Sequence, residues 1–216
     1  MTAGRVATIE DLGPAWMLAD DAPLTPGPLD TAFGRIAPRF LDIGIGNGDA
    51  TRAWAQAHPD VDVVAVELHR PGIAHLLRQL AADGPRNVRV VDADVTALLP
   101  SAPPESFEAI RILFPDPWPK KRHHKRRLVD PGFVRGATDR LAPGGRLHLA
   151  TDWPDYAEAM RAALAVEPRL RPDVDHGLVP STWRTNRPNR PITAYEQRGL
   201  DAGREATDLV AIRLDG

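Results

Sequence analysis

The first candidate for a ligand-binding loop is the stretch L-D-I-G-I-G-N-G at 41–48. It contains an acid, Asp42, followed by three glycines, Gly44, Gly46 and Gly48. Glycines let the backbone turn tightly between a strand and a helix, and they leave room for a ligand at the helix N-terminus. The spacing differs from the G-x-G-x-x-G typical of a dinucleotide pyrophosphate site. A carboxylate at Asp42 would repel a pyrophosphate and favour a positively charged ligand. The alternative is a tight turn with a structural acid.

Two more acids follow the next two apolar stretches, Glu67 after 61–66 and Asp94 after 88–91. The carboxyl ends of parallel strands meet at one sheet edge, where ligands bind. Glu67 could there accept both ribose hydroxyls of an adenosyl group, and Asp94 its adenine amino group. S-adenosyl-L-methionine carries an ammonium, a sulfonium and no phosphate, so the three acids predict it as the cofactor. Each acid alone could be a solvated strand end, and His69 or Asp92 could take these roles instead.

The richest segment is F-P-D-P-W-P-K-K-R-H-H-K-R-R at 114–127. Its three prolines stiffen the chain around Asp116 and Trp118, which suits a carboxylate that must hold one position against a substrate. Trp118 offers a face for base stacking. The run can neutralise phosphates through Lys120, Lys121, Arg122, Lys125, Arg126 and Arg127, with His123 and His124 between them. A basic run is often only a solvated surface, but an adjoining rigid acid and aromatic favour nucleic-acid binding.

Two later segments carry further candidates. Asp152 in T-D-W at 151–153 could bind substrate or cap the helix expected from Pro154, and the sequence leaves both open. The polar stretch 181–199 combines arginines with Trp183 and Tyr195, which suits phosphate contact and base stacking; the arginines are Arg184, Arg187, Arg190 and Arg198. Trp183 could equally pack on the core.

Strand and helix patterns alternate and position these residues. Strands are expected at 40–43, 61–66, 88–91, 109–114, 147–150 and 207–214, and helices at 49–58, 71–84, 131–142 and 154–166. This alternation predicts an α/β fold, Rossmann-like, with a mostly parallel sheet and helices on both faces. Residues 1–35 are expected to form an irregular N-terminal arm with at most a short helix near 29–36, and 36–216 one catalytic domain. The secondary structure of 169–204 is left open.

Composition excludes several classes of protein. The 216-residue chain is 43% hydrophobic and 26% charged, which indicates a folded domain rather than disorder. It has no Cys, and its adjacent His123 and His124 lack the spacing of a helical metal pair, so no metal site is expected. The start shows no signal peptide, and no stretch suits a membrane span. The lack of Cys fits a reducing cytoplasm, so we expect a cytoplasmic protein. The net charge of −2 makes the dense basic run a local feature.

Together these motifs resemble the bacterial tRNA (guanine-N7-)-methyltransferase family. The resemblance covers about 35–214 and is carried by D-I-G-I-G-N-G at 42–48, V-E at 66–67, the segment 114–127, T-D-W at 151–153 and T-A-Y-E-Q-R-G at 193–199. The glycine loop is common to many methyltransferases, whereas P-D-P-W with its basic run and the late T-x-Y-E are far more specific. Asn47 and Pro119 depart from the family's usual residues, and Pro119 puts the pose of Lys120 in doubt.

The resemblance implies roles for particular residues. Asp42, Glu67, Asp94 and Asp116 would contact the cofactor, with Asp116 also the active-site residue. Substrate contacts would come from Lys120, Asp152 and the segment with Thr193, Tyr195 and Glu196, and RNA contacts from 122–127. The expected activity is transfer of a methyl group from S-adenosyl-L-methionine to N7 of a guanine in tRNA.

Three alternatives stay open at this point. They are a non-catalytic RNA-binding protein that keeps the fold, a nicotinamide-dependent oxidoreductase, and a methyltransferase acting on protein or a small molecule. Asp42 and the glycine spacing argue against the oxidoreductase, and the basic run argues against a protein or small-molecule substrate. The tRNA position and the choice between monomer and homodimer are not readable from the residues.

Overall fold

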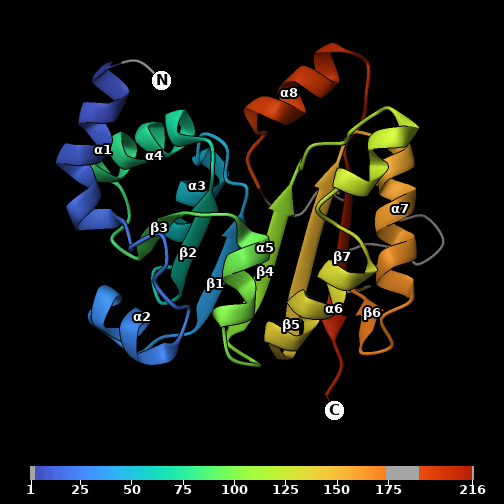
Figure 1. The fold of residues 1–216 in the computed structure, drawn as a ribbon, viewed down its shortest axis with the longest axis horizontal. Coiled ribbons are helices and arrows are strands. Elements are labelled where there is room, and N and C mark those ends of the chain that lie inside the picture. The colour runs from blue at the N-terminus through green and yellow to red at the C-terminus, as the bar shows by residue number, and fades with distance from the viewer. Residues whose placement is uncertain (1–2, 174–189, 216) are drawn as a thin grey trace.

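The computed structural model describes residues 3–173 and 190–215, and they are built around one sheet of seven strands (Figure 1). The strand order is β3-β2-β1-β4-β5-β7-β6. Neighbouring strands from β3 to β5 run parallel, and β7 is antiparallel to both β5 and β6. The strands are β1 (Arg39–Ile43), β2 (Asp62–Glu67), β3 (Val88–Asp92), β4 (Phe107–Leu113), β5 (Leu141–Thr151), β6 (Leu170–Pro172) and β7 (Thr207–Arg213).

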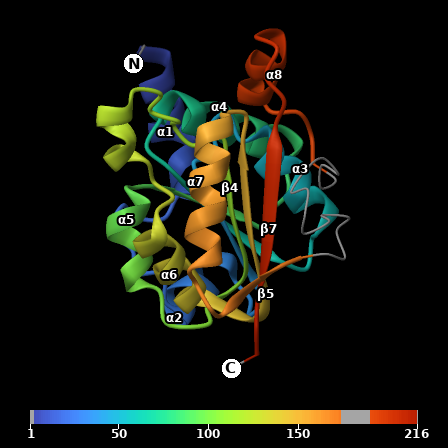
Figure 2. The same ribbon diagram turned by 90° about the vertical axis from the view of Figure 1, so that its right-hand side faces the viewer.

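Helices cover both faces of the sheet (Figures 1 and 2). The α-helices are α1 (Ala3–Trp16), α2 (Pro26–Phe33), α3 (Asp49–Ala57), α4 (Arg70–Asp83), α5 (Val95–Leu98), α6 (Pro131–Arg140), α7 (Pro154–Ala165) and α8 (Ala194–Asp201). Two short 3-10 helices are η1 (Leu99–Ser101) and η2 (Lys121–Arg126). The architecture confirms the α/β fold with a mostly parallel sheet that the sequence predicts.

Two apolar cores separate the layers, one on each face of the sheet. Strands β1 to β3 alternate their side chains, so Val63 and Ala65 face α3 and α4 while Val64 and Val66 face the opposite core. That second core is filled by α5, α6 and α7, with Tyr156 and Met160 of α7 fully buried. Strands apolar on both sides explain the continuous hydrophobic stretches of the sequence.

The N-terminal region differs from the irregular arm that the sequence predicts. It forms α1 and α2, and Met17 adds a bridge to Val90 of β3. The hydrophobic periodicity of α1 is weak, and the helix contains Gly13 and Pro14. Ile9 nevertheless lies in the core beside α4. Tertiary packing therefore stabilises a helix that local propensity does not indicate. The division of the chain at residue 35 stays a prediction.

Strand β5 is also longer than expected. It begins at Leu141, where A-P-G-G suggests the end of a helix, and pairs with Phe107 before a register irregularity near Ala109. The extension contributes to the core, because Leu141 and its partner Phe107 are both completely buried. Helix α8, in the segment that the sequence leaves open, stands above the carboxyl ends of the strands (Figure 1).

Candidate active site

The glycine loop leaves β1 at the carboxyl edge of the sheet and leads into α3. Gly44, Gly46 and Gly48 have φ values of 70°, 58° and 81°, a left-handed conformation that favours glycine. The N–H of Gly46 donates to Glu67 Oε2 at 2.8 Å, so the acid that ends β2 fixes the loop of β1. Behind the loop, a Cβ on Gly72 of α4 would stand 1.9 Å from the carbonyl oxygen of Gly46.

Glu67 is held by three backbone groups. Besides Gly46, the N–H groups of Leu68 and His69 donate to its Oε1 at 2.7 and 2.8 Å. An ionised carboxylate has about four acceptor positions, so Glu67 retains capacity for a ligand. The third acid, Asp94, caps α5 with Oδ1, which accepts from both N and Oγ1 of Thr96 at 2.8 Å. No described residue donates to its Oδ2.

One cavity at the carboxyl edge, with a volume of about 770 Å³, collects most of the predicted cofactor residues. Its walls include Gly44, Gly46, Glu67, Asp94 and Asp116. Small-molecule sites typically have volumes of about 300–1,000 Å³, so this cavity has the size of such a site. The sequence prediction that these residues meet at one edge therefore agrees with the geometry.

Asp42 does not line that cavity, and borders a smaller one together with Gly44 and Gly48. Its Oδ1 accepts from Arg111 Nε at 3.0 Å, and its Oδ2 accepts from Arg111 Nη2 at 2.6 Å and Thr51 Oγ1 at 2.7 Å. Its exposed fraction is 3%, as is that of Arg111. The carboxylate of Asp42 thus neutralises the buried guanidinium of Arg111 instead of being exposed. A direct contact between Asp42 and a cofactor stays a prediction.

The Asp116 loop begins where β4 ends. Phe114 and Trp118, which bracket Pro115-Asp116-Pro117, have φ values of 53° and 43°, unusual for residues with a side chain. Such backbone strain persists where surrounding structure enforces it and is frequent at functional sites. Asp116 is exposed on the cavity wall, and within the described residues its carboxylate has no hydrogen bond or ion pair. It is therefore available to a ligand.

The basic run forms η2 beside this loop. The exposed cations are Lys120, Lys121, Arg122, Lys125 and Arg126, whereas His123 and His124 are half-buried. Arg126 lies over the Trp118 ring, 4.9 Å from its centroid, and His123 meets that ring edge-on at 5.9 Å. One face of Trp118 is thus already covered, which restricts the base stacking that the sequence suggests.

Arg127 turns inward. Its Nε donates to the carbonyl of Pro117 at 2.8 Å, its Nη2 to Asp155 at 2.7 Å, and its guanidinium covers the Tyr156 ring at 4.6 Å. His124 approaches the same Asp155 at 3.4 Å. This geometry makes Arg127 an anchor that fastens the basic run to α7, so an RNA contact by Arg127 itself stays a prediction.

Helix α8 holds the predicted substrate residues Thr193, Tyr195 and Glu196. Thr193 caps it, its Oγ1 accepting from the N–H of Glu196 at 3.1 Å. Tyr195 is exposed on the cavity wall and lies over the glycine loop, since a Cβ on Gly46 would stand 3.0 Å from its ring. Glu196 is only 4% exposed and pairs with Arg190.

Asp152 lies between β5 and α7 without capping that helix. The N-cap is Trp153, and no side chain accepts a hydrogen bond there, so the capping alternative is wrong. Asp152 Oδ2 instead accepts from Arg204 Nε at 2.8 Å, and α8 packs against it at Gly199. The remaining candidates of 181–189, with Trp183, lie outside the described residues.

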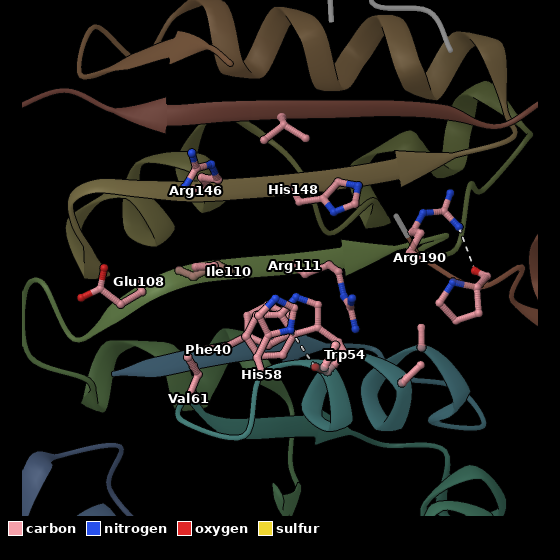
Figure 3. A pocket seen from close by; sticks show the side chains of 16 residues that line it. Phe40, Trp54, His58, Val61, Glu108, Ile110, Arg111, Arg146, His148 and Arg190 are labelled. Atoms are coloured by element: carbon pink, nitrogen blue, oxygen red, sulfur yellow. Dashed lines mark hydrogen bonds between the residues drawn. The ribbon is translucent and has the colours of Figure 1, made fainter. Parts of the chain in front are cut away.

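A second cavity, of about 740 Å³, opens on the α3 side of the sheet (Figure 3). The aromatic rings of Phe40, Trp54 and His58 form one wall, and Arg111 and His148 project from β4 and β5 (Figure 3). Basic side chains in its lining are paired with acids: Arg111 with Asp42, His148 and Arg190 with Asp208, and Arg146 with Asp173. Burial lowers the pKa of His148 below its ordinary value, and the hydrogen bond to Asp208 only partly opposes this.

Sequence reasoning missed the residues that support the site. Gly72 and Arg111 carry no local motif, and only the sheet order brings Arg111 beside Asp42. The sequence does single out Arg190, as one of the arginines of 181–199 that suit phosphate contact. In the structure its side chain is buried and pairs with Asp208 and Glu196. Within 3–173 and 190–215 no cluster of His, Asp and Glu could hold a metal ion. The same residues contain no helix long and apolar enough to cross a membrane.

The strand order, the glycine loop and the acid-lined cavity define a methyltransferase of the Rossmann-like class. Residues 36–209 match the family described as "Putative methyltransferase". The solved 16S rRNA methyltransferase KamB has the same fold, with a TM-score of 0.59, 16% identity, and coverage of 86% of this chain and 94% of KamB. An rRNA methylase from Streptococcus thermophilus superposes with a TM-score of 0.53 at 15% identity, over 83% of this chain and 88% of that one.

Similarity in sequence identifies the particular family. The chain is 46% identical to a tRNA (guanine-N(7)-)-methyltransferase of Alkalilimnicola ehrlichii, over 97% of this chain and 86% of the relative. It is 43% identical to the protein of the same name from Thiobacillus denitrificans, over 96% of this chain and 88% of the relative. The chain belongs to the tRNA (guanine-N(7)-)-methyltransferase family, as its motifs predict.

Proposed function

We propose that this chain transfers a methyl group from S-adenosyl-L-methionine to N7 of a guanine in tRNA. One observation carries the proposal beyond family membership. Asp116, an exposed carboxylate with no partner in 3–173 and 190–215, shares a cavity wall with Glu67 and Asp94 and adjoins a run of exposed cations. The cavity suits a small ligand, and the cations suit a polyanion. A tRNA substrate favours the cytoplasm as its place of action.

The acids suit the proposed cofactor. Glu67, preorganised by three backbone N–H groups, would accept hydrogen bonds from ribose hydroxyls, and Asp94 Oδ2 would accept from the adenine amino group. The three glycines of the loop would lie beside the ligand and place no side chains of their own in its way. When bound, S-adenosyl-L-methionine supplies an electrophilic methyl group on a positively charged sulfur. The chain's own work is to bind, orient and stabilise charge.

Asp116 would act on the guanine. N7 has a lone pair and no proton, so it needs no general base. Positive charge develops on the purine during the transfer, and a fixed carboxylate stabilises that charge and accepts from the N1–H and amino groups. The strained backbone at Phe114 and Trp118 would hold Asp116 in place before the substrate arrives.

The surrounding elements would hold the tRNA. Arg122, Lys125 and Arg126 are exposed and would contact phosphates, while Arg127 fixes their loop to α7. Tyr195 would pack against the target nucleotide from the α8 side, since it lines the same cavity. Asp152, Thr193 and Glu196 would support that helix and any substrate contacts it makes.

The test is Asp116→Asn, which keeps the size of the side chain and removes its charge. Turnover with tRNA should fall by about 10²–10³-fold, the usual effect of losing one preorganised charge-stabilising group. The affinity for tRNA should stay within about threefold, because stabilisation develops in the transition state. The matched control is Asp60→Asn, an exposed acid in the turn before β2, which should leave both quantities unchanged. Equal losses of turnover, tRNA affinity and thermal stability in Asp116→Asn would contradict the proposal.

A further inference from the structure

Arg190 joins three separate elements at the carboxyl edge of the sheet. Its Nε and Nη2 donate to the two oxygens of Asp208 on β7 at 3.0 and 2.9 Å. Its Nη1 donates to Glu196 of α8 at 2.6 Å. The guanidinium also lies 5.3 Å from the centroid of the Phe114 ring, at the start of the Asp116 loop. The arginine side chain is 3% exposed, so these contacts form inside the protein.

Two of these elements contribute residues to the wall of the same cavity. Phe114 begins the strained segment that presents Asp116, and its N–H donates to the carbonyl of Ala150 on β5 at 2.8 Å. Glu196 belongs to the first turn of α8, one residue after Tyr195, which covers the glycine loop. Arg190 thus connects the loop that carries the acid to the helix that carries the aromatic ring.

The third element gives the connection a rigid base. Asp208 lies within the sheet, where it pairs in register with Ala150 of β5, and it also accepts from His148 Nε2 at 2.7 Å. Hydrogen bonds from His148 and Arg190 hold the pKa of Asp208 below its ordinary value although burial alone would raise it. The arginine therefore bridges two carboxylates, both of which are buried.

We propose that Arg190 is a positioning residue for the methyl transfer, which fixes the separation of the Asp116 loop and α8 without touching cofactor or tRNA. This inference rests on the proposed function. Methyl transfer depends on near in-line approach, and a displacement of about 1 Å can cost about 10² in rate. A planar guanidinium can serve Asp208 through two nitrogens and Glu196 through the third, whereas a lysine ammonium is a compact point charge.

The experiment compares Arg190→Lys with the matched control Arg169→Lys. Arg169 also bridges two carboxylates, Glu167 at 2.7 Å and Asp139 at 2.6 Å, but it lies between α7 and β6, away from the site. For each variant we would measure the melting temperature, the affinity for S-adenosyl-L-methionine and for tRNA, and kcat per folded molecule. Arg190→Lys should lower kcat about 10–100-fold and change either affinity by less than about threefold. Arg169→Lys should keep the kcat of the unmodified protein.

Two outcomes would overturn the inference. One is a kcat per folded molecule that is unchanged in Arg190→Lys, and the other is a fall in Arg169→Lys as large as in Arg190→Lys. If Arg190→Lys does not fold, Glu196→Gln replaces it, because this change weakens the α8 connection and keeps the Asp208 pair. A different methylated product from the unmodified protein would refute the proposed function alone, since the variants would still report on positioning in that reaction.

Discussion

Replacing Asp42 by Asn tests a buried charge pair next to the site. The substitution keeps the size of the side chain but leaves the Arg111 guanidinium without its counter-charge. In the native protein the two side chains are each 4% exposed and are joined by hydrogen bonds of 3.0 and 2.6 Å, with a third bond from Thr51 at 2.7 Å. The amide can replace one of the acceptor oxygens at most.

The expected loss of stability is large because Arg111 would remain charged inside the protein. Removing one partner of a buried pair typically costs about 3–5 kcal/mol of unfolding free energy. For a domain of about 150–250 residues each kcal/mol lowers the melting temperature by about 2–4 °C, so Asp42→Asn should melt roughly 6–20 °C lower. Replacing Arg111 by Met in the same chain should restore part of this loss, since the double variant buries no unpaired charge.

Chemical denaturation of the two single variants and the double variant measures these values as a double-mutant cycle. Asp42→Asn is expected to act on stability, whereas Glu67→Ala is expected to act on ligand binding. Glu67→Ala should weaken the binding free energy of S-adenosyl-L-methionine by roughly 1–3 kcal/mol, because charge-assisted hydrogen bonds are removed. A change of less than about 1 kcal/mol in the unfolding free energy of Asp42→Asn would refute the reasoning that this acid is a buried structural partner of Arg111.

The glycine loop, the basic run and the buried histidine each give a further prediction. Gly72→Ala should weaken S-adenosyl-L-methionine binding at least tenfold, as measured by titration calorimetry, because the added Cβ would stand 1.9 Å from the carbonyl oxygen of Gly46. The control is Gly136→Ala in α6, where a Cβ meets nothing within 4 Å, and it should keep the affinity of the unmodified protein. Equal affinities of the two variants would contradict the prediction. Alanine at Arg122, Lys125 and Arg126 together should reduce the log–log salt slope of tRNA binding by about 0.7–0.9 for each phosphate that is no longer bound. A wild-type slope in that triple variant would contradict RNA binding by these side chains. Burial lowers the pKa of His148, so as the pH falls below 6.5 this histidine is protonated in the unfolded chain before it is protonated in the folded protein. The free energy of unfolding should therefore fall in this pH range, and it should fall by more in the unmodified protein than in His148→Gln. Parallel pH profiles of the two proteins would contradict this prediction.

The sequence predicts the fold well because its signals are local. Apolar stretches specify the strands, and the glycine loop, the proline-rich loop and their acids stand where strands end. Glu67, Asp94 and Asp116 can therefore be placed on one edge from the sequence alone, and they do line one cavity. Their individual ligand contacts remain predictions.

Long-range contacts are beyond sequence reasoning. Arg111 reaches Asp42 from another strand, and Arg190 joins β7 to α8, so neither pairing has a spacing that a motif could reveal. Arg127 looks like its neighbours in the basic run, yet the fold turns it toward Asp155. Helix α1 escapes sequence reasoning because packing on α4, not its own periodicity, stabilises it.

The atom that accepts the methyl group distinguishes the proposed function from every alternative. Identifying the methylated nucleoside is the most direct way to determine that atom. Unmodified tRNA would be incubated with the protein and isotope-labelled S-adenosyl-L-methionine, digested to nucleosides and analysed by mass spectrometry. We expect labelled N7-methylguanosine, at a guanine where reduction and mild amine treatment break the strand. Label on N1 or N2 of guanine, on a ribose or on protein, with none on N7, would contradict methyl transfer to N7.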